Sequence, residues 1–124
     1  MTSNGQGTDI TLGWVDTVNC AKGCVNDYWT TAQAKPNYDS SQDVNWIDGF
    51  TENQYTVIQF YRYLDTGEIE DTSLNLVTNI LWATHTSSDP SSSTTFSQHT
   101  NKGVSNYNFL SPKCKCYDPS YYFI

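Results

Sequence analysis

Apolar and polar residues alternate in short segments along most of the chain, which is the pattern of half-buried β-strands. In residues 9–16, Ile10, Leu12 and Trp14 fall at every second position, so their side chains share one face of a strand. Residues 26–34 form a second extended segment. Residues 54–64 carry apolar side chains on both faces, which favours a central place in a sheet.

Turn residues separate these segments. Asp48-Gly49 predicts a turn after the short apolar segment 44–47, and Asp65-Thr66-Gly67 ends the strand at 54–64. The acidic run from there to Asp71 reads as a solvated connection. Further along, segment 74–83 fits both helical and strand spacing, and its β-branched and aromatic residues favour a strand. A long polar loop at 87–97 then precedes a last core strand at 106–110.

Short strands joined by turn clusters, with no convincing helix, predict an all-β fold, an immunoglobulin-like antiparallel β-sandwich. The chain has 124 residues, which suits a single domain. We expect one domain over 1–124, with its core at about 8–110 and a tail at 111–124 that is rich in cysteine and aromatic residues.

The charge of the chain excludes two classes of partner. The formal net charge is −7 and the pI is near 4.4, whereas nucleic acids and anionic membranes require clustered Lys and Arg. The longest apolar stretches fall far short of the ~20 residues of a membrane span. We therefore expect no nucleic-acid partner and no membrane span.

The four cysteines form two pairs near the ends of the chain, Cys20 with Cys24 and Cys114 with Cys116. Four cysteines allow three pairings, and the sequence cannot choose among them. We favour bridges between the N-terminal and C-terminal pairs, with a zinc site or free thiols as alternatives, although neither spacing is typical of a zinc knuckle. Disulfides predict an oxidising, extracellular or secreted setting.

Several short segments, in order, resemble the DOMON domain, a β-sandwich module of copper monooxygenases, ferric reductases and sugar-dehydrogenase cytochromes. Each segment alone is weak, but their order and intervals together are specific. The segments are Asp-Ile-Thr-Leu-Gly-Trp-Val-Asp (9–16), Asp-Tyr-Trp (27–29), Tyr-Asp-Ser-Ser-Gln-Asp-Val (38–44), Tyr-Arg-Tyr-Leu-Asp-Thr (61–66), Ile-Leu-Trp-Ala (80–83) and Gln-His-Thr-Asn-Lys-Gly (98–103).

The resemblance implies possible cofactors, and the chain departs from the family pattern at two points. Lys102 stands where family members usually have arginine, and the only methionine, Met1, lies outside any predicted strand. Haem-binding members use an axial Met and an axial His, so here His99 is the one residue that matches a haem ligand. A pair of His85 and His99 could hold haem iron, but a histidine in a polar loop such as that around His99 is more often structural and hydrogen-bonded to the backbone.

In the monooxygenase-linked branch, the resemblance further implies a cation site. Carried over, its ligands are Asp9, Asp43 and the main-chain carbonyls of Ile10 and Tyr28, which are hard oxygen donors suited to Ca²⁺. The alternative is that both aspartates cap turns through their own backbone hydrogen bonds.

No residue pattern points to catalysis, since two histidines cannot build a copper-monooxygenase core and no nucleophile motif is present. We therefore expect no enzyme but an extracellular module that binds a cation, a glycan or, less readily, haem. Trp29 and Trp46 could stack on sugar rings, although such aromatics more often form core. The alternative is a structural subunit of an extracellular filament that self-associates through its terminal segments, the aromatic tail 117–124 among them.

Overall fold

Residues 7–16, 18, 20 and 24–110 are described in a computed structural model of the chain, and these residues form strands and loops without a helix. The strands are β1 (Thr8–Trp14), β2 (Cys24–Thr30), β3 (Asn37–Tyr38), β4 (Asn45–Glu52), β5 (Tyr55–Tyr61), β6 (Val77–Thr84) and β7 (Asn101–Asn108). The prediction of an all-β, antiparallel β-sandwich is confirmed.

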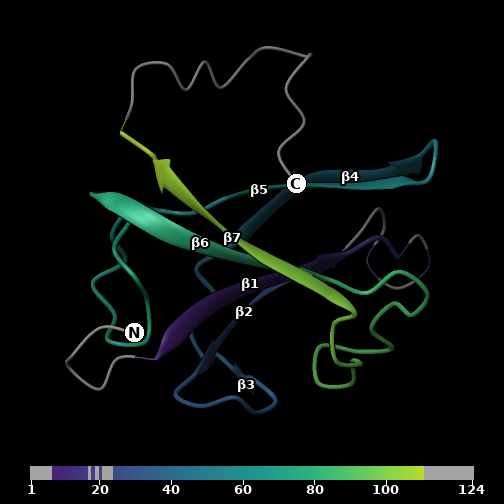
Figure 1. The fold of residues 1–124 in the computed structure, drawn as a ribbon, viewed down its shortest axis with the longest axis horizontal. Coiled ribbons are helices and arrows are strands. Elements are labelled where there is room, and N and C mark those ends of the chain that lie inside the picture. Colours follow the sequence, from purple (N-terminus) through teal and green to yellow (C-terminus); the bar gives the residue numbers. More distant parts are fainter. Residues whose placement is uncertain (1–6, 17, 19, 21–23, 111–124) are drawn as a thin grey trace.

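The strands pair only with antiparallel neighbours and form three small sheets. One sheet has the order β1-β2-β3, and the hairpins β4-β5 and β6-β7 form the other two. Figure 1 shows these ribbons crossing one another, with β6 and β7 paired at a distance from the tip of the β4-β5 hairpin. The predicted strands overlap β1, β2, β5 and β6, whereas β3 and β4 were not predicted and β7 begins before the predicted strand at 106–110.

The predicted turn at Asp48-Gly49 is wrong, because both residues lie inside β4. A register shift between Trp46 and Asp48 interrupts the pairing of β4 with β5. The side chain of Trp46 covers Gly49, where an added Cβ would lie 2.2 Å from the Trp46 ring. The absence of a side chain at Gly49 thus leaves space for the indole of Trp46, and the glycine does not form a turn.

The chain reverses instead at Asn53 and Gln54, between β4 and β5. Both residues have positive φ angles, 48° and 70°, as a two-residue hairpin turn with the twist of its strands requires. Neither residue is glycine, so the usual Asn-Gly or Asp-Gly signal is absent from the sequence at this turn.

The sheets pack where β1 and β2 meet β4 and β5. At Gly13 of β1, an added Cβ would lie 2.9 Å from Cγ2 of Ile58 on β5, so the missing side chain lets the two strands approach closely. The buried apolar residues of the described part are Trp14, Cys24, Tyr28, Val44 and Val57. The core therefore lies mainly against β1 and β2.

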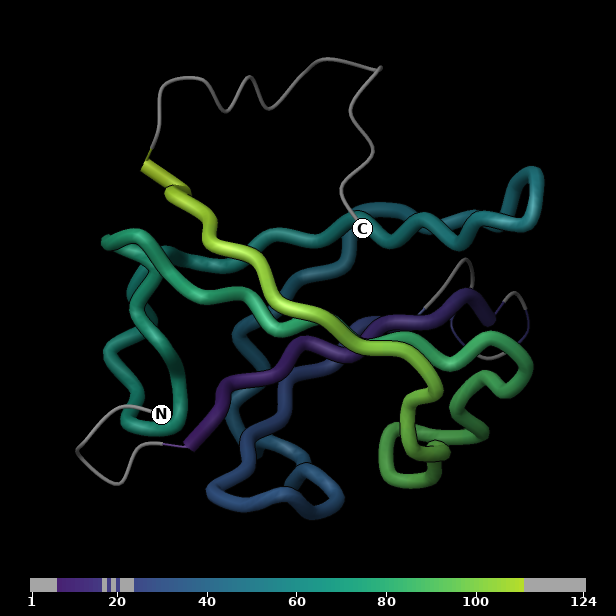
Figure 2. Tube along the Cα trace, in the orientation of Figure 1, coloured from purple at the N-terminus to yellow at the C-terminus, as the bar shows by residue number. Residues whose placement is uncertain are grey.

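The long loop between β6 and β7 returns to the first sheet, as the green segment of the trace in Figure 2 shows. Phe96 packs edge-on against the ring of Tyr28, at 5.5 Å between centroids. The Tyr28 hydroxyl donates a hydrogen bond to the carbonyl of Ser93 at 2.5 Å. A loop that the sequence indicated only as polar is thus held to β2 by a buried tyrosine.

Cys20 and Cys24 form a disulfide with each other, so the favoured bridges between the two terminal pairs are wrong for these cysteines. The Cys20 amide bonds the Asp16 carbonyl at 3.2 Å, and this turn between β1 and β2 brings the two Cα atoms to 5.3 Å, a spacing that suits a disulfide. The oxidised sulfurs of Cys20 and Cys24 cannot serve as thiolate ligands of a zinc site. Cys114 and Cys116, with the tail 111–124, lie outside the described residues, as does Met1.

Candidate functional site: a buried carboxylate cluster

Three aspartates gather on the inner side of the first sheet. Their carboxylate oxygens, from Asp9, Asp27 and Asp71, all lie within 4.8 Å of one another. In the β1-β2 register Asp27 is opposite Thr11, two residues from Asp9, so alternation of side chains places both aspartates on one face. Asp71 comes from the connection between β5 and β6.

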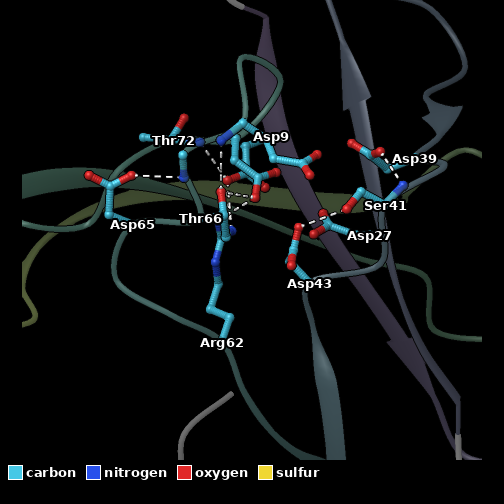
Figure 3. A network of polar contacts seen from close by, with 12 residues as sticks. Asp9, Asp27, Asp39, Ser41, Asp43, Arg62, Asp65, Thr66 and Thr72 are labelled. Atoms are coloured by element: carbon cyan, nitrogen blue, oxygen red, sulfur yellow. Dashed lines mark hydrogen bonds and ion pairs between the residues drawn. The ribbon is translucent and has the colours of Figure 1, made fainter.

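Arg62, which follows β5 directly, supplies the positive charge of this cluster (Figure 3). Its Nη1 atom donates to Oδ2 of Asp9 at 2.7 Å, and its Nη2 atom lies 3.2 Å from Oδ2 of Asp71. The three side chains are only 9%, 7% and 5% exposed. The expectation of a solvated acidic connection is therefore wrong at Asp71, which is in a buried ion pair.

Main-chain and hydroxyl groups complete the shells of two carboxylates. Oδ2 of Asp9 also accepts a hydrogen bond from the Thr72 amide at 2.8 Å, and Oδ2 of Asp71 accepts one from the Thr66 hydroxyl at 2.6 Å. The Arg62 guanidinium thus closes the β5-β6 connection onto β1. Because Arg62, Asp9 and Asp71 are all buried, the loss of any one of them would leave an uncompensated buried charge.

Asp27 is the carboxylate of the cluster without a full set of partners, and Nε and Nη2 of Arg62 also lack a hydrogen-bond partner among the described residues. Its side chain is wholly buried, Oδ1 accepts a hydrogen bond from the Tyr28 amide at 3.0 Å, and Oδ2 has no partner among the described residues. Burial, and then the charges of Asp9 and Asp71, raise the pKa of Asp27 to about 7, against the opposing effect of Arg62. A proton or a cation at Asp27 would therefore relieve the cost of burying its charge.

A glutamine fixes the backbone that carries Asp27. Gln42 accepts a hydrogen bond from the Asp27 amide at 2.8 Å through Oε1 and donates through Nε2 to the Asp27 carbonyl at 2.9 Å. The same Nε2 atom donates to the Asp39 carbonyl at 2.8 Å. The glutamine side chain therefore bonds both polar groups of one residue, as a neighbouring strand does.

Comparison with known proteins bears on this region directly. The family model of the DOMON domain matches residues 2–85, a range that contains every member of the cluster and more than half of the chain. The chain belongs to the DOMON domain family. No curated protein and no solved structure matches it.

Within this DOMON domain, the structure places the predicted cation ligands in three positions. Asp9 belongs to the cluster, and Ile10 and Tyr28 are paired with each other in the β1-β2 register. Asp43 accepts a hydrogen bond from the Ser41 hydroxyl at 3.2 Å. Figure 3 shows Asp43 beside the first sheet, on the side of Asp27.

His85 and His99 lie apart from this cluster in the chain and have no contact with it among those described. His99 is exposed in the loop that precedes β7. His85 is half-buried, and its Nδ1 atom accepts a hydrogen bond from the Ser87 amide at 3.3 Å. Haem ligation by His99 stays a prediction.

Sequence reasoning missed Asp27, Arg62 and Asp71 as site residues. One signal was present: Arg62 stands between two tyrosines at the end of an apolar strand, and an arginine in such a position usually needs a buried counter-charge. Asp9 could not be identified as the partner of Arg62 because the two residues are far apart in the sequence. No helix suited to crossing a membrane occurs in the part of the chain that the structure describes.

Proposed function

We propose that this protein is a non-catalytic extracellular DOMON module that binds a divalent cation at its buried carboxylate cluster, with Ca²⁺ as the preferred ion. The observation that carries the proposal is the unpartnered Oδ2 atom of Asp27, wholly buried beside two further carboxylates. Oxygen ligands of this kind are those that Ca²⁺ selects.

The charge balance supports a bound cation. Three carboxylates face one guanidinium, so the ionised cluster carries two excess negative charges, which a divalent ion would neutralise. Asp9 and Asp27 are the central ligands of the proposed site. The family resemblance adds Asp43 and the carbonyls of Ile10 and Tyr28 as further donors.

Calcium-dependent stability tests this proposal. Addition of Ca²⁺ should raise the thermal midpoint of the protein, and a chelator should reverse the rise, because a ligand that binds only the folded state adds about 2.7 kcal/mol at a concentration of 100 times its Kd. Asp27→Asn should abolish the calcium effect. Asp48→Asn is the control, since Asp48 also bonds the amide that follows it, at 2.9 Å to Gly49, but lies outside the cluster.

Two results would count against the cation site. One is a midpoint that neither Ca²⁺ nor chelator moves. The other is an equal calcium effect in the wild type and in Asp27→Asn. The extracellular location is supported by the Cys20–Cys24 disulfide, since such bonds persist in oxidising compartments.

A second candidate function, a subunit of an extracellular filament, is supported by the β6-β7 sheet. This sheet has two strands in the described part of the chain, and its residues Leu81 and Val104 are 65% and 63% exposed. Unpaired edges with exposed apolar residues favour strand addition by another copy. Light scattering across a concentration series tests it, and a monodisperse monomer at every concentration would exclude filament assembly.

A further inference from the structure

The loop between β6 and β7 carries a serine or threonine at every position from 91 to 95, directly after Asp89-Pro90. Figure 2 shows this loop, in green, at the periphery of the trace. The exposed residues of the run are Ser91, Ser92, Thr94 and Thr95. Runs of Ser and Thr beside proline are typical of O-glycosylated segments, whereas the sequence contains no Asn-X-Ser/Thr acceptor for N-linked sugar.

Peptide groups give the run its shape. The Ser91 amide donates a hydrogen bond to the Thr95 carbonyl at 2.9 Å, and the Thr95 amide donates one to the Ser92 carbonyl at 3.2 Å. These two bonds close a turn over residues 92–95. Because both bonds run between main-chain groups, the turn does not depend on any side-chain hydroxyl of the run.

Two side chains from the first sheet and its loops fix the turn to the rest of the domain. The Tyr28 hydroxyl donates to the Ser93 carbonyl at 2.5 Å, and Nζ of Lys35 donates to the Thr94 carbonyl at 2.5 Å. Ser93 is half-buried as a result. Both anchors bind carbonyl oxygens, so they leave the hydroxyl groups of the run available for other chemistry.

The hydroxyl groups themselves have weak partners or none. Oγ of Ser92 and Oγ1 of Thr94 lie 3.4 Å apart, and Oγ of Ser91 lies 3.4 Å from the Thr95 carbonyl, beyond the usual length of an O–H···O hydrogen bond. Oγ of Ser92 also accepts from the Thr94 amide at 3.3 Å, which an ether oxygen can still do. The Thr95 hydroxyl has no hydrogen bond with any described residue.

Other hydroxyls of the described chain are bound more firmly. Oγ1 of Thr30 donates to the Ala32 carbonyl at 2.8 Å, and Oγ1 of Thr66 donates to the buried Asp71 carboxylate at 2.6 Å. Attachment of a group to either oxygen would remove that donor and break the bond. At Thr95 the same change breaks no hydrogen bond, so the fold tolerates modification there at the lowest cost.

We propose that the run 91–95 is an acceptor site for O-linked sugar, with Thr95 as the first residue modified. The hydroxyl oxygen forms a bond to the anomeric carbon of a nucleotide-activated N-acetylhexosamine. The bond from that carbon to the diphosphate breaks, and the nucleoside diphosphate leaves with the electron pair and takes up the hydroxyl proton. The inference rests on the extracellular location proposed above, because Ser/Thr runs of this kind are modified on secreted chains.

A transferase reaction on the folded protein tests the acceptor site. The protein is produced in a host that lacks O-glycosylation, with its disulfide oxidised, and is incubated with a polypeptide N-acetylgalactosaminyltransferase and UDP-N-acetylgalactosamine. We expect the intact mass to increase by N-acetylhexosamine, and electron-transfer fragmentation should place the first sugar on Thr95. Because fragmentation maps the wild-type protein itself, this result does not depend on the folding of a variant. No added sugar, or a first sugar outside 91–95, would overturn the proposal.

Variants separate the run from exposed threonines in general. Thr95→Ala should remove the first sugar, and alanine at every position of the run should abolish incorporation. Thr51→Ala and Thr56→Ala are the matched controls, since both threonines are exposed but lie opposite each other in the β4-β5 ladder. They should leave incorporation unchanged. Equal incorporation by the wild type and by the all-alanine run would contradict the proposal.

Failure of this reaction is distinguishable from failure of the proposed function. The transferase meets the purified protein in solution, so a negative result excludes the acceptor site without bearing on the extracellular location. The carboxylates of Asp9 and Asp27 take no part in the reaction, and chelator added to the protein before the assay and then removed should not alter the mapped residue. The calcium effect on the thermal midpoint is measured separately.

Discussion

Replacement of Asp27 by asparagine should make the protein more stable at high pH, although it removes a charged residue from a buried cluster. Asparagine has the same shape, and its Oδ1 atom can keep the hydrogen bond from the Tyr28 amide. Its Nδ2 donor would replace the unpartnered Oδ2 atom and face the carboxylates of Asp9 and Asp71. The variant therefore removes a buried negative charge and adds a donor where acceptors gather.

The size of the effect follows from the pKa. Asp27 has a pKa of about 7 in the folded protein against 3.8 for an ordinary aspartate. Because the folded pKa is raised, the folded state holds a proton that the unfolded state has lost between these pH values, so stability falls as pH rises through this window. The full penalty above the folded pKa is about 4 kcal/mol, an upper bound, and about 2–3 kcal/mol of it develops between pH 5 and pH 8.

Urea unfolding in the presence of chelator, at pH 5 and pH 8, measures this directly. The advantage of Asp27→Asn over wild type in the free energy of unfolding should grow by about 2–3 kcal/mol from the lower to the higher pH. Asp48→Asn should show no such growth. The reasoning is refuted if the difference between Asp27→Asn and wild type is the same at both pH values.

Three other variants test the remaining contacts. Arg62→Met should cost about 3–5 kcal/mol in urea unfolding, since it strands buried carboxylates; a loss no larger than that of an exposed arginine would contradict the buried ion pairs. Gly13→Val should cost about 1–3 kcal/mol by pushing against Ile58, and an unchanged midpoint would show that β1 and β5 do not pack there. Replacing Cys20 and Cys24 with serine should cost about 2 kcal/mol by the chain-entropy model for so short a loop, and a reducing agent should destabilise the wild type but not this double variant.

Much of the fold could be predicted because β-strands produce a local alternation of apolar and polar residues in the sequence. The alternation at Ile10, Leu12 and Trp14 marks β1, and the mixed segment 54–64 contains β5. The β4-β5 turn could not be predicted in this way, since Asn53 and Gln54 take left-handed conformations that glycine usually signals. Asp48-Gly49 was wrongly predicted to be a turn, because the glycine there leaves space for the ring of Trp46 inside a strand.

The site was less predictable because its members meet only through the fold. Asp9 could be named from its resemblance to a family ligand, but Arg62 and Asp71 lie more than fifty residues further along the chain. Alternation indicates which face of a strand a side chain occupies and not which connection covers that face. The contact of the β5-β6 connection with β1 is therefore a tertiary contact, which local sequence patterns do not predict.

The glutamine that bonds the main chain of Asp27 constrains evolution at a position that looks like ordinary surface. Its side-chain amide serves as a substitute peptide group, with one acceptor and one donor in the order that a strand would present. Glutamate has the length but no donor, and asparagine has both groups but a shorter reach. Neither glutamate nor asparagine can therefore replace Gln42 and keep both hydrogen bonds. Such a substitution would weaken the support of Asp27 although Asp9, Arg62 and Asp71 were all unchanged.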